Sequence, residues 1–161
     1  ASISGKTASL FATSCRIGAI TGGLGGDEKE ALTEYGQGFG MAFQIVDDVL
    51  DVIATDEQLG KPAGHDLLEG VYTLPVLRTM AADPGGELRT LLGGPLDPSE
   101  WERARTLVRT SGAVEDSLAV AAEHVAAASA ALERVGDGPS TTALADAADR
   151  LLAGVREITT D

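Results

Sequence analysis

One segment, residues 40–51, constrains the fold of this chain more than any other, because it sets three carboxylates into an otherwise apolar stretch, GMAFQIVDDVLD. At 100° of rotation per residue, an α-helix brings four of its polar side chains within an arc of about 100°. They belong to Gln44, Asp47, Asp48 and Asp51. Apolar side chains occupy the rest of the circumference, unlike an ordinary amphipathic helix with one wet face. We therefore predict a helix inside a bundle, with a narrow acidic stripe that faces an internal cavity.

The acidic stripe has a chemical cost that a metal ion would offset. Carboxylates that share one cavity repel one another, and each raises the pKa of its neighbours unless a cation joins them. Oxygen ligands with room for water suit Mg²⁺, which binds through a few carboxylates together with substrate phosphates. A solvated helix face is the competing interpretation, but such a face carries Lys, Glu or Ser between its acids. Because this segment carries valine and leucine there, we predict a magnesium site.

The composition excludes several classes of protein. With 161 residues, the chain is long enough for one domain with a buried core. A net charge of −13 argues against nucleic acid as a partner and against attraction to anionic membranes. No apolar run approaches the length of about 18 residues that a transmembrane helix needs. The single cysteine, Cys15, excludes an internal disulfide framework and fits a reducing, cytoplasmic compartment.

Helical periodicity recurs along the chain and β-branched alternation is scarce, so we expect an all-α, largely antiparallel helical bundle over residues 1–161 as a single region. The expected helices cover about 4–22, 28–54, 73–82, 84–92, 99–110, 113–135 and 140–158, with a loop at 55–72. Within the acidic helix, Gly36 and Gly40 each cost about 1 kcal/mol relative to Ala, which predicts that they make room for a neighbouring helix or a ligand. Trp101 is expected to be a core or helix-contact residue. Because the chain begins at Ala1 inside a helical pattern, without an initiator Met, we expect it to be a piece of something longer.

Two lysines flank the acidic stripe in the sequence. Lys6 lies in Gly-Lys-Thr-Ala at the start of the first expected helix, and Lys61 lies in the Gly-Lys-Pro-Ala-Gly loop that leaves the acidic helix. A loop lysine at the mouth of a magnesium-lined cavity is well placed to neutralise phosphate oxygens. Plain surface charge is the alternative for each lysine taken singly, but their position on either side of the aspartates favours a shared role.

A series of short motifs, in this order and spacing, resembles the carboxyl-terminal half of the trans-isoprenyl diphosphate synthases, the polyprenyl synthetase family. The motifs are Lys6-Thr7-Ala8, Tyr35-Gly36, Gly40-x-x-Phe43-Gln44-x-x-Asp47-Asp48-x-x-Asp51, Gly60-Lys61-Pro62, Asp66-Leu67 and Thr73-Leu74-Pro75. From about residue 80 onward the chain is similar only in being helical. The resemblance implies the isoprenoid-synthase type of all-α fold, in which two aspartate-rich motifs face each other across a hydrophobic tunnel.

The resemblance also implies an activity and a metal site. The family transfers prenyl groups in isoprenoid biosynthesis: with Mg²⁺, it condenses isopentenyl diphosphate head-to-tail with an allylic diphosphate to make a longer polyprenyl diphosphate. Asp47, Asp48 and Asp51 match the second aspartate-rich motif of the family, with Asp47 and Asp51 as the direct metal ligands. Asp66 matches an acidic residue in the outer shell of the metal.

Five further residues match substrate-handling positions of the family. Lys6 and Lys61 match lysines that hold the departing diphosphate. Thr7 matches a threonine at a helix break near the reacting carbons. Gln44 matches a glutamine that stabilises the region of the allylic cation, and Phe43 matches an aromatic residue near the isopentenyl group.

The sequence departs from the family pattern in two ways. Val71 stands where many members have a lysine that binds diphosphate, which indicates a subgroup rather than an inactive protein. The first aspartate-rich motif and the isopentenyl diphosphate pocket would lie upstream of Ala1. We therefore expect the chain to supply half an active site, to be inactive by itself, and to work with an amino-terminal half in the same or a separate chain. The family usually forms homodimers.

Two other interpretations stay open. A non-catalytic regulatory subunit of a prenyl synthase fits Val71 and the missing half, although the retained aspartates and Lys6 argue against it. A class I terpene cyclase fragment would share the fold. The cyclase interpretation is disfavoured because the Asn/Ser/Glu metal motif that should follow the first acidic run is absent from residues 52–161.

Overall fold

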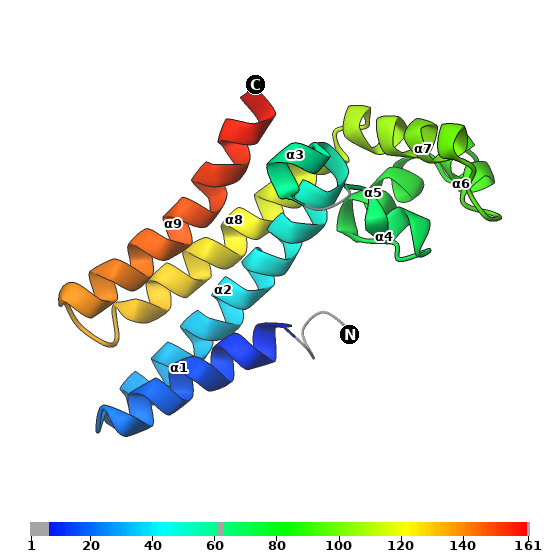
Figure 1. Cartoon of the computed structure of the whole chain (residues 1–161). Coiled ribbons are helices and arrows are strands. Elements are labelled where there is room, and N and C mark those ends of the chain that lie inside the picture. Colours follow the sequence, from blue (N-terminus) through cyan, green and yellow to red (C-terminus); the bar gives the residue numbers. More distant parts are fainter. Residues whose placement is uncertain (1–6, 61–62, 161) are drawn as a thin grey trace. The chain divides into compact units, whose positions relative to one another are not determined.

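The computed structural model describes residues 7–60 and 63–160, and these residues form helices joined by turns, with no strand among them (Figure 1). The helices are α1 (Ser9–Thr21), α2 (Gly26–Ile53), α3 (Asp56–Leu59), α4 (His65–Leu68), α5 (Leu74–Ala82), α6 (Glu87–Leu91), α7 (Pro98–Thr110), α8 (Ala113–Leu132) and α9 (Pro139–Thr160). The all-α class expected from the periodicity is confirmed. Within the described ranges, no helix is both long and apolar enough to cross a membrane.

The segment expected to be a loop, residues 55–72, is not purely irregular. It contains two single-turn helices, α3 and α4. The first begins at a capping box: the Thr55 hydroxyl accepts the Gln58 N–H, and the Gln58 side chain accepts the Thr55 N–H. Two glycines in the left-handed region lie between the turns: Gly60, with φ 65°, ends α3, and Gly64, with φ 66°, precedes α4. The glycines indicated a loop, but glycine in this conformation also stands at the ends of short helices.

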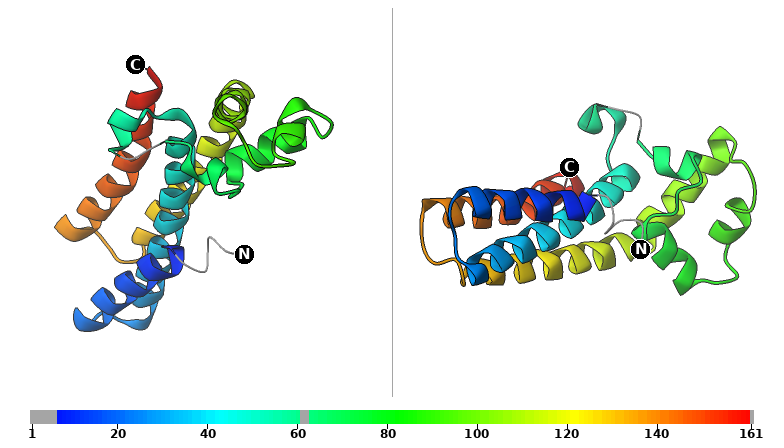
Figure 2. Two further views of the ribbon diagram at one scale, coloured as in Figure 1. Left: turned by 45° about the vertical axis from the view of Figure 1, so that its right-hand side comes forward. Right: turned by 90° about the horizontal axis from the view of Figure 1, so that it is seen from below.

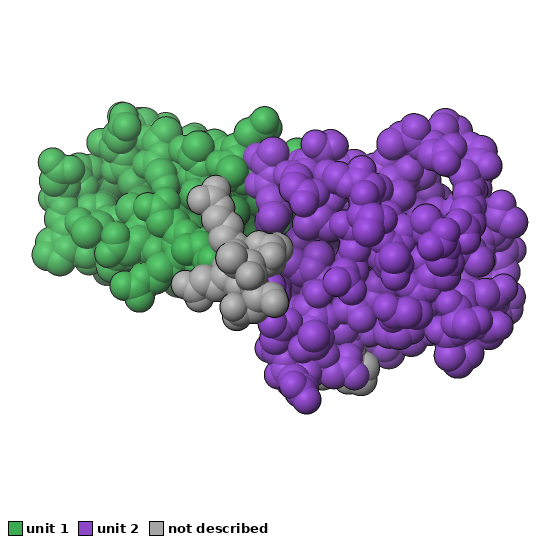
Figure 3. Space-filling model, turned by 90° about the horizontal axis from the view of Figure 1, so that it is seen from above, with its two compact units in different colours: residues 1–46, 120–157 green, residues 47–119, 158–161 purple. Residues whose placement is uncertain are grey.

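Internal contacts divide the chain into two compact units, which Figure 3 colours separately. Unit 1 consists of residues 1–46 and 120–157, and unit 2 consists of residues 47–119 and 158–161. The expectation of a single all-α region over residues 1–161 concerns how these units fit together, and it stays a prediction.

In unit 1, α1 and α2 lie side by side in all views (Figures 1 and 2). Two glycines of α2 permit this approach. A Cβ atom on Gly36 would lie 2.7 Å from the carbonyl oxygen of Phe11, and one on Gly40 would lie 2.7 Å from the Cα atom of Ala8. The prediction that these glycines make room for a neighbour is confirmed, and that neighbour is a helix.

Tyr35 ties α2 to α9 within unit 1. Its side chain is buried, and its hydroxyl donates a hydrogen bond of 2.8 Å to the carbonyl oxygen of Leu144. Burial, together with the charge of the Cys15 thiolate, raises the pKa of Tyr35 to about 12. The hydroxyl therefore stays protonated, and keeps its donor role, at a pH where an unfolded chain has lost that proton.

The raised pKa of Tyr35 predicts a loss of stability in alkali. Between pH 10 and about 12 the unfolded chain has released the Tyr35 proton while the folded chain retains it, so the free energy of unfolding falls as the pH rises through this window. Tyr35→Phe should remove this part of the pH dependence, at a cost of about 1 kcal/mol near neutral pH for the lost hydrogen bond. Denaturant unfolding of both proteins across the window measures the difference. Parallel stability curves for the two proteins would contradict the prediction.

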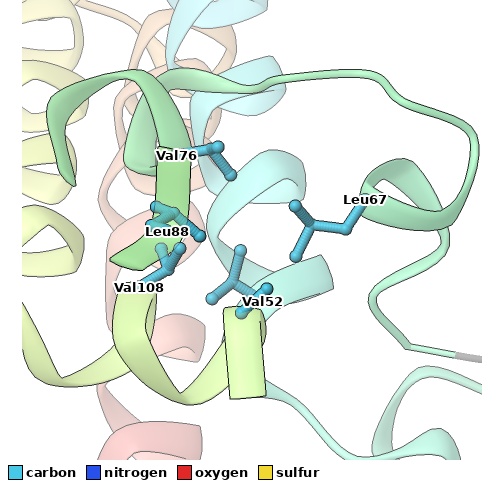
Figure 4. Packing of buried hydrophobic residues seen from close by; sticks show 6 residues of the cluster. Val52, Leu67, Val76, Leu88 and Val108 are labelled. Carbon is cyan, nitrogen blue, oxygen red and sulfur yellow. The ribbon is translucent and has the colours of Figure 1, made fainter. Parts of the chain in front are cut away.

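The core of unit 2 gathers six buried aliphatic side chains from five helices, two from α7 and one each from α2, α4, α5 and α6 (Figure 4). These residues are Val52, Leu67, Val76, Leu88, Ala104 and Val108, all less than 5% exposed. Trp101 packs against the cluster from α7, as expected for a helix-contact residue. The end of the acidic helix is therefore anchored in the same core that holds α4 and α7.

Candidate functional site

Two of the predicted site residues, 37 positions apart, meet in unit 1. The Thr7 hydroxyl donates a hydrogen bond of 2.9 Å to the side-chain oxygen of Gln44. Thr7 and Ala8 form a π-helical turn directly before α1, and this turn stands where the resemblance implies a helix break. Since Ala8 also lies against Gly40, the close approach of α1 and α2 is what brings the threonine to the glutamine.

Phe43 lies at one end of a row of aromatic rings. Its ring centroid is 5.5 Å from that of Phe11, which is 5.2 Å from that of Phe39. Tyr35 continues the row, with its ring stacked on Phe39. Phe43 remains 40% exposed, so part of its ring is available to an apolar or cationic ligand, while the other rings fix its position.

The three aspartates of the stripe differ in burial. Asp47 is exposed to solvent, whereas Asp48 is 3% and Asp51 6% exposed. A buried carboxylate carries a large desolvation cost, which partners must offset. The acidic stripe is therefore two-thirds buried, as its apolar surroundings implied. The cavity that all three aspartates were expected to face stays a prediction.

Asp51 binds the loop that leads into α4. Its two carboxylate oxygens accept the backbone N–H groups of His65 and Asp66, each at 3.3 Å. Its carbonyl oxygen accepts the Gly64 N–H at 2.7 Å. The structure thus brings Asp51 beside the backbone of Asp66, the two being 15 positions apart, and both are residues that the sequence assigned to the metal site.

The two predicted diphosphate lysines, Lys6 and Lys61, lie outside the described residues. Among the residues that are described, no group of three or more His, Cys, Asp or Glu side chains is placed to hold a metal ion. Mg²⁺ does not require such a cage, because it keeps several waters and binds through one or two carboxylates together with substrate phosphates. The donors present are all carboxylate oxygens, and Asp47 is open to solvent, so the chemistry of the donor set fits Mg²⁺.

The structure adds two residues of α7 that sequence analysis did not assign to the site. Arg105 is 8% exposed and donates from Nε to the carbonyl oxygen of Val52 at 2.7 Å, and from a second guanidinium nitrogen to the carbonyl oxygen of Ala54. The indole N–H of Trp101 donates to the carbonyl oxygen of Gly64 at 3.0 Å. The guanidinium lies 5.5 Å from the centroid of the Trp101 ring, within the range of a cation–π contact.

A signal for Arg105 was present in the sequence. Trp101, Ala104, Arg105 and Val108 follow the i, i+3, i+4, i+7 spacing of one helical face. A lone arginine on an otherwise apolar face indicates a buried cation with a specific acceptor. The acceptors themselves could not be read from the sequence, because they lie 51 and 53 positions away.

Comparison with known families gives one match. The family model described as polyprenyl synthetase matches residues 1–109.

Two curated relatives illustrate the similarity. The chain is 40% identical over 149 residues to a short chain isoprenyl diphosphate synthase of Methanothermobacter thermautotrophicus, an alignment that covers 91% of this chain and 46% of the relative. It is 38% identical over 120 residues to heptaprenyl diphosphate synthase component 2 of Geobacillus stearothermophilus, covering 74% of this chain and 38% of the relative. The chain therefore spans less than half the length of these relatives.

A solved structure agrees in fold. Geranylgeranyl pyrophosphate synthase from Corynebacterium glutamicum, crystallised with calcium and isoprenyl diphosphate, superposes with a TM-score of 0.86 at 35% sequence identity. The superposition covers 95% of this chain and 48% of the crystallised one. The described helices thus follow the isoprenoid-synthase fold, as the sequence predicted.

Proposed function

Because this chain belongs to the polyprenyl synthetase family, we propose that it supplies the second aspartate-rich half of a magnesium-dependent prenyl diphosphate synthase. The observation that carries the proposal is the 2.9 Å hydrogen bond between Thr7 and Gln44, which joins two separate motif residues of the family. Asp51, with its hydrogen bonds to the backbone of α4, supports the same assignment from unit 2.

The proposed reaction is a head-to-tail condensation. The bond between the first carbon of an allylic diphosphate and its diphosphate oxygen breaks, and an allylic cation forms. The double bond of isopentenyl diphosphate attacks this cation, and loss of a proton gives a prenyl diphosphate longer by one unit. Mg²⁺, when bound, would neutralise negative charge on the departing diphosphate.

The residues of this chain have distinct proposed roles. The Thr7 hydroxyl fixes the Gln44 amide, whose dipole then stabilises positive charge on the allylic carbons. The exposed part of the Phe43 ring offers an apolar, electron-rich face to the isopentenyl group. Lys6 and Lys61 are proposed to hold the departing diphosphate, since ammonium groups are strong partners of phosphate oxygens.

Four carboxylates form the proposed metal site, and their surroundings suggest which of them bind the metal directly. Asp47 is open to solvent and is proposed as a direct ligand. Asp51 already accepts two long hydrogen bonds from backbone N–H groups, but a carboxylate offers about four lone pairs, so it can also bind metal. Two further aspartates complete the proposed set. Asp48 is buried and follows Asp47 in the sequence, and Asp66 lies at the start of α4.

An amino-terminal half, in the same or a separate chain, is the proposed partner. The chain spans 46% of its relative from Methanothermobacter thermautotrophicus. Moreover, three large apolar side chains of α1 fall within about 80° of one another around the helix and are all exposed: Leu10 by 68%, Ile17 by 55% and Ile20 by 57%. An apolar helix face of this kind marks a protein interaction surface. We also propose that the completed enzyme forms a homodimer, as members of the family usually do. A reducing, cytoplasmic compartment agrees with the single cysteine.

A complementation assay tests the proposal. The chain alone, with Mg²⁺, an allylic diphosphate and isopentenyl diphosphate, should form no prenyl product, because it lacks the first aspartate-rich motif. Addition of an amino-terminal half that carries that motif, from the same gene or from the Methanothermobacter relative, should restore product formation, measured by incorporation of labelled isopentenyl diphosphate. Turnover by the chain alone would refute the half-site.

The same assay addresses the second candidate, a non-catalytic regulatory subunit. That candidate is favoured by Val71, which is 48% exposed where many family members place a diphosphate-binding lysine. A complex that forms with the amino-terminal half but yields no product would count for a regulator. Product formation that depends on the aspartates of this chain would count against it.

A further inference from the structure

We propose that Trp101 and Arg105 of α7 are positioning residues for the aspartate site, because they hold the end of α2 and the loop of residues 63–66 in one fixed register. This inference rests on the proposed function, since it concerns how the chain aims Asp51 and Asp66 at a metal-bound diphosphate. Neither α7 residue touches the metal or the substrate in this proposal. They act through the backbone that carries the two aspartates.

Two aspartates hold the backbone of the loop. Four consecutive backbone N–H groups, those of residues 63–66, donate to Asp51 or Asp56. Ala63 donates to the Asp56 carboxylate at 2.8 Å, and Gly64 to the Asp51 carbonyl oxygen at 2.7 Å. His65 and Asp66 donate to the Asp51 carboxylate at 3.3 Å. The last two distances are long for N–H···O bonds, so the two contacts to the Asp51 carboxylate would by themselves hold His65 and Asp66 weakly.

Trp101 makes a further contact with the loop. Its indole N–H donates to the Gly64 carbonyl oxygen at 3.0 Å, so Gly64 is bound through both its N–H and its C=O. The indole also lies directly on the glycine: a Cβ atom on Gly64 would be 2.6 Å from Cζ2 of Trp101. Gly64 adopts φ 66°, a conformation that favours glycine. The tryptophan therefore fits one backbone geometry of the loop and excludes bulkier alternatives.

Arg105 fixes the helix end that carries Asp51. Its two hydrogen bonds go to the carbonyl oxygens of Val52 and Ala54, at the C-terminus of α2. This end of a helix carries a partial negative charge, and the aspartates of the stripe add to it. A buried guanidinium on these carbonyls offsets that charge without neutralising any carboxylate of the site. The Arg105 guanidinium also lies over the Trp101 ring, so the two side chains contact each other as well as the backbone.

A role in core packing alone would require less than this. Trp101 does pack against the core of unit 2, but a phenylalanine could fill much of that space. What phenylalanine cannot supply is the indole N–H that binds Gly64. Trp101→Phe therefore separates the packing role from the positioning role. Arg105→Met is the harsher variant, because it leaves two helix-end carbonyls without their donors.

The test compares Trp101→Phe with wild type in the purified protein. Without metal, amide hydrogen exchange of residues 63–66 should become about threefold to tenfold faster, as expected for the loss of one hydrogen bond. In the complemented assay, the Mg²⁺ concentration for half-maximal activity should rise about tenfold, as for residues that orient metal ligands. The KM for isopentenyl diphosphate should stay unchanged, because the loop does not contribute to that pocket in the proposed site.

Arg103→Met is the matched control, since Arg103 lies on the same helix and pairs with Glu87 on the surface. It should alter neither the exchange of residues 63–66 nor the Mg²⁺ requirement. Unchanged exchange and unchanged Mg²⁺ requirement in Trp101→Phe would overturn the inference. Faster exchange in a variant whose Mg²⁺ requirement matches wild type would also overturn it, because Trp101 would then be purely structural. If the wild-type protein transferred no prenyl group even when complemented, and amide exchange of residues 63–66 were still faster in Trp101→Phe, the result would instead refute the proposed function.

Discussion

Asp47→Asn should lower prenyl transfer by the complemented enzyme about 100-fold or more, the scale on which one group that stabilises transition-state charge contributes. The unfolding free energy should change by less than about 0.5 kcal/mol, because Asp47 is exposed and surface substitutions have small effects. Asparagine keeps the shape of the side chain, but it removes the charge and replaces one acceptor oxygen by an NH₂ donor. Initial rates over a Mg²⁺ titration, together with denaturant unfolding, measure both quantities.

Asp51→Asn provides an informative contrast on the same helix. Asp51 is 6% exposed and its carboxylate accepts two backbone N–H groups, so this variant should lose activity and also about 1–3 kcal/mol of stability. Asp27→Asn, in the exposed first turn of α2, is the control that should retain activity. Full activity of Asp47→Asn at every Mg²⁺ concentration would contradict the proposal that this residue binds metal.

Helical phase is the part of the site that the sequence predicts best. The rotation per residue is a local property, so the grouping of Gln44 with the aspartates on one arc follows from their spacing alone. The same reasoning predicted that Gly36 and Gly40 face a close neighbour. Which aspartates would be buried was not predictable. Burial depends on which segments far along the chain cover each side of α2.

Short-range structure after α2 was harder to predict, for a physical reason. A single helical turn such as α4 makes few hydrogen bonds of its own and depends on partners elsewhere. Its partner is the Asp51 carboxylate, 14 and 15 positions earlier. The sequence marked Asp51 as a metal ligand but gave no sign that the same carboxylate holds the backbone of α4. Sequence analysis did not assign Arg105 to the site for the same reason, because its acceptors are backbone carbonyl oxygens far away along the chain.

These observations connect folding to the chemistry of the site. Asp51 holds α4 through its side chain and holds Gly64 through its carbonyl oxygen. A metal ion that draws on the Asp51 carboxylate would therefore act on the loop of residues 63–66 as well. In the proposed metal site, the position of the Asp51 carboxylate and the order of this loop would depend on the same hydrogen bonds. In unit 1, the packing of α1 against α2 sets the position of Thr7 relative to Gln44.

Gly40→Ala should reverse the usual effect of this substitution. In a helix, alanine normally gains about 1 kcal/mol over glycine, and Gly18→Ala in α1 should show this gain, because a Cβ atom there meets nothing within 4 Å. At Gly40 the new Cβ atom would lie 2.7 Å from the backbone Cα of Ala8. Overpacking of this kind costs about 1–3 kcal/mol, so the net effect should be destabilising.

The strain at Gly40 should also reach the site. Relief requires α1 to move away from α2 at Ala8, and this movement would carry the neighbouring Thr7 hydroxyl away from Gln44, to which it is bonded at 2.9 Å. We therefore expect Gly40→Ala to lower prenyl transfer about tenfold even where the protein remains folded, as for other displaced supporting contacts. Unfolding free energies and initial rates of both alanine variants measure the two effects. A gain in stability at Gly40 equal to that at Gly18 would show that the two helices do not approach each other so closely.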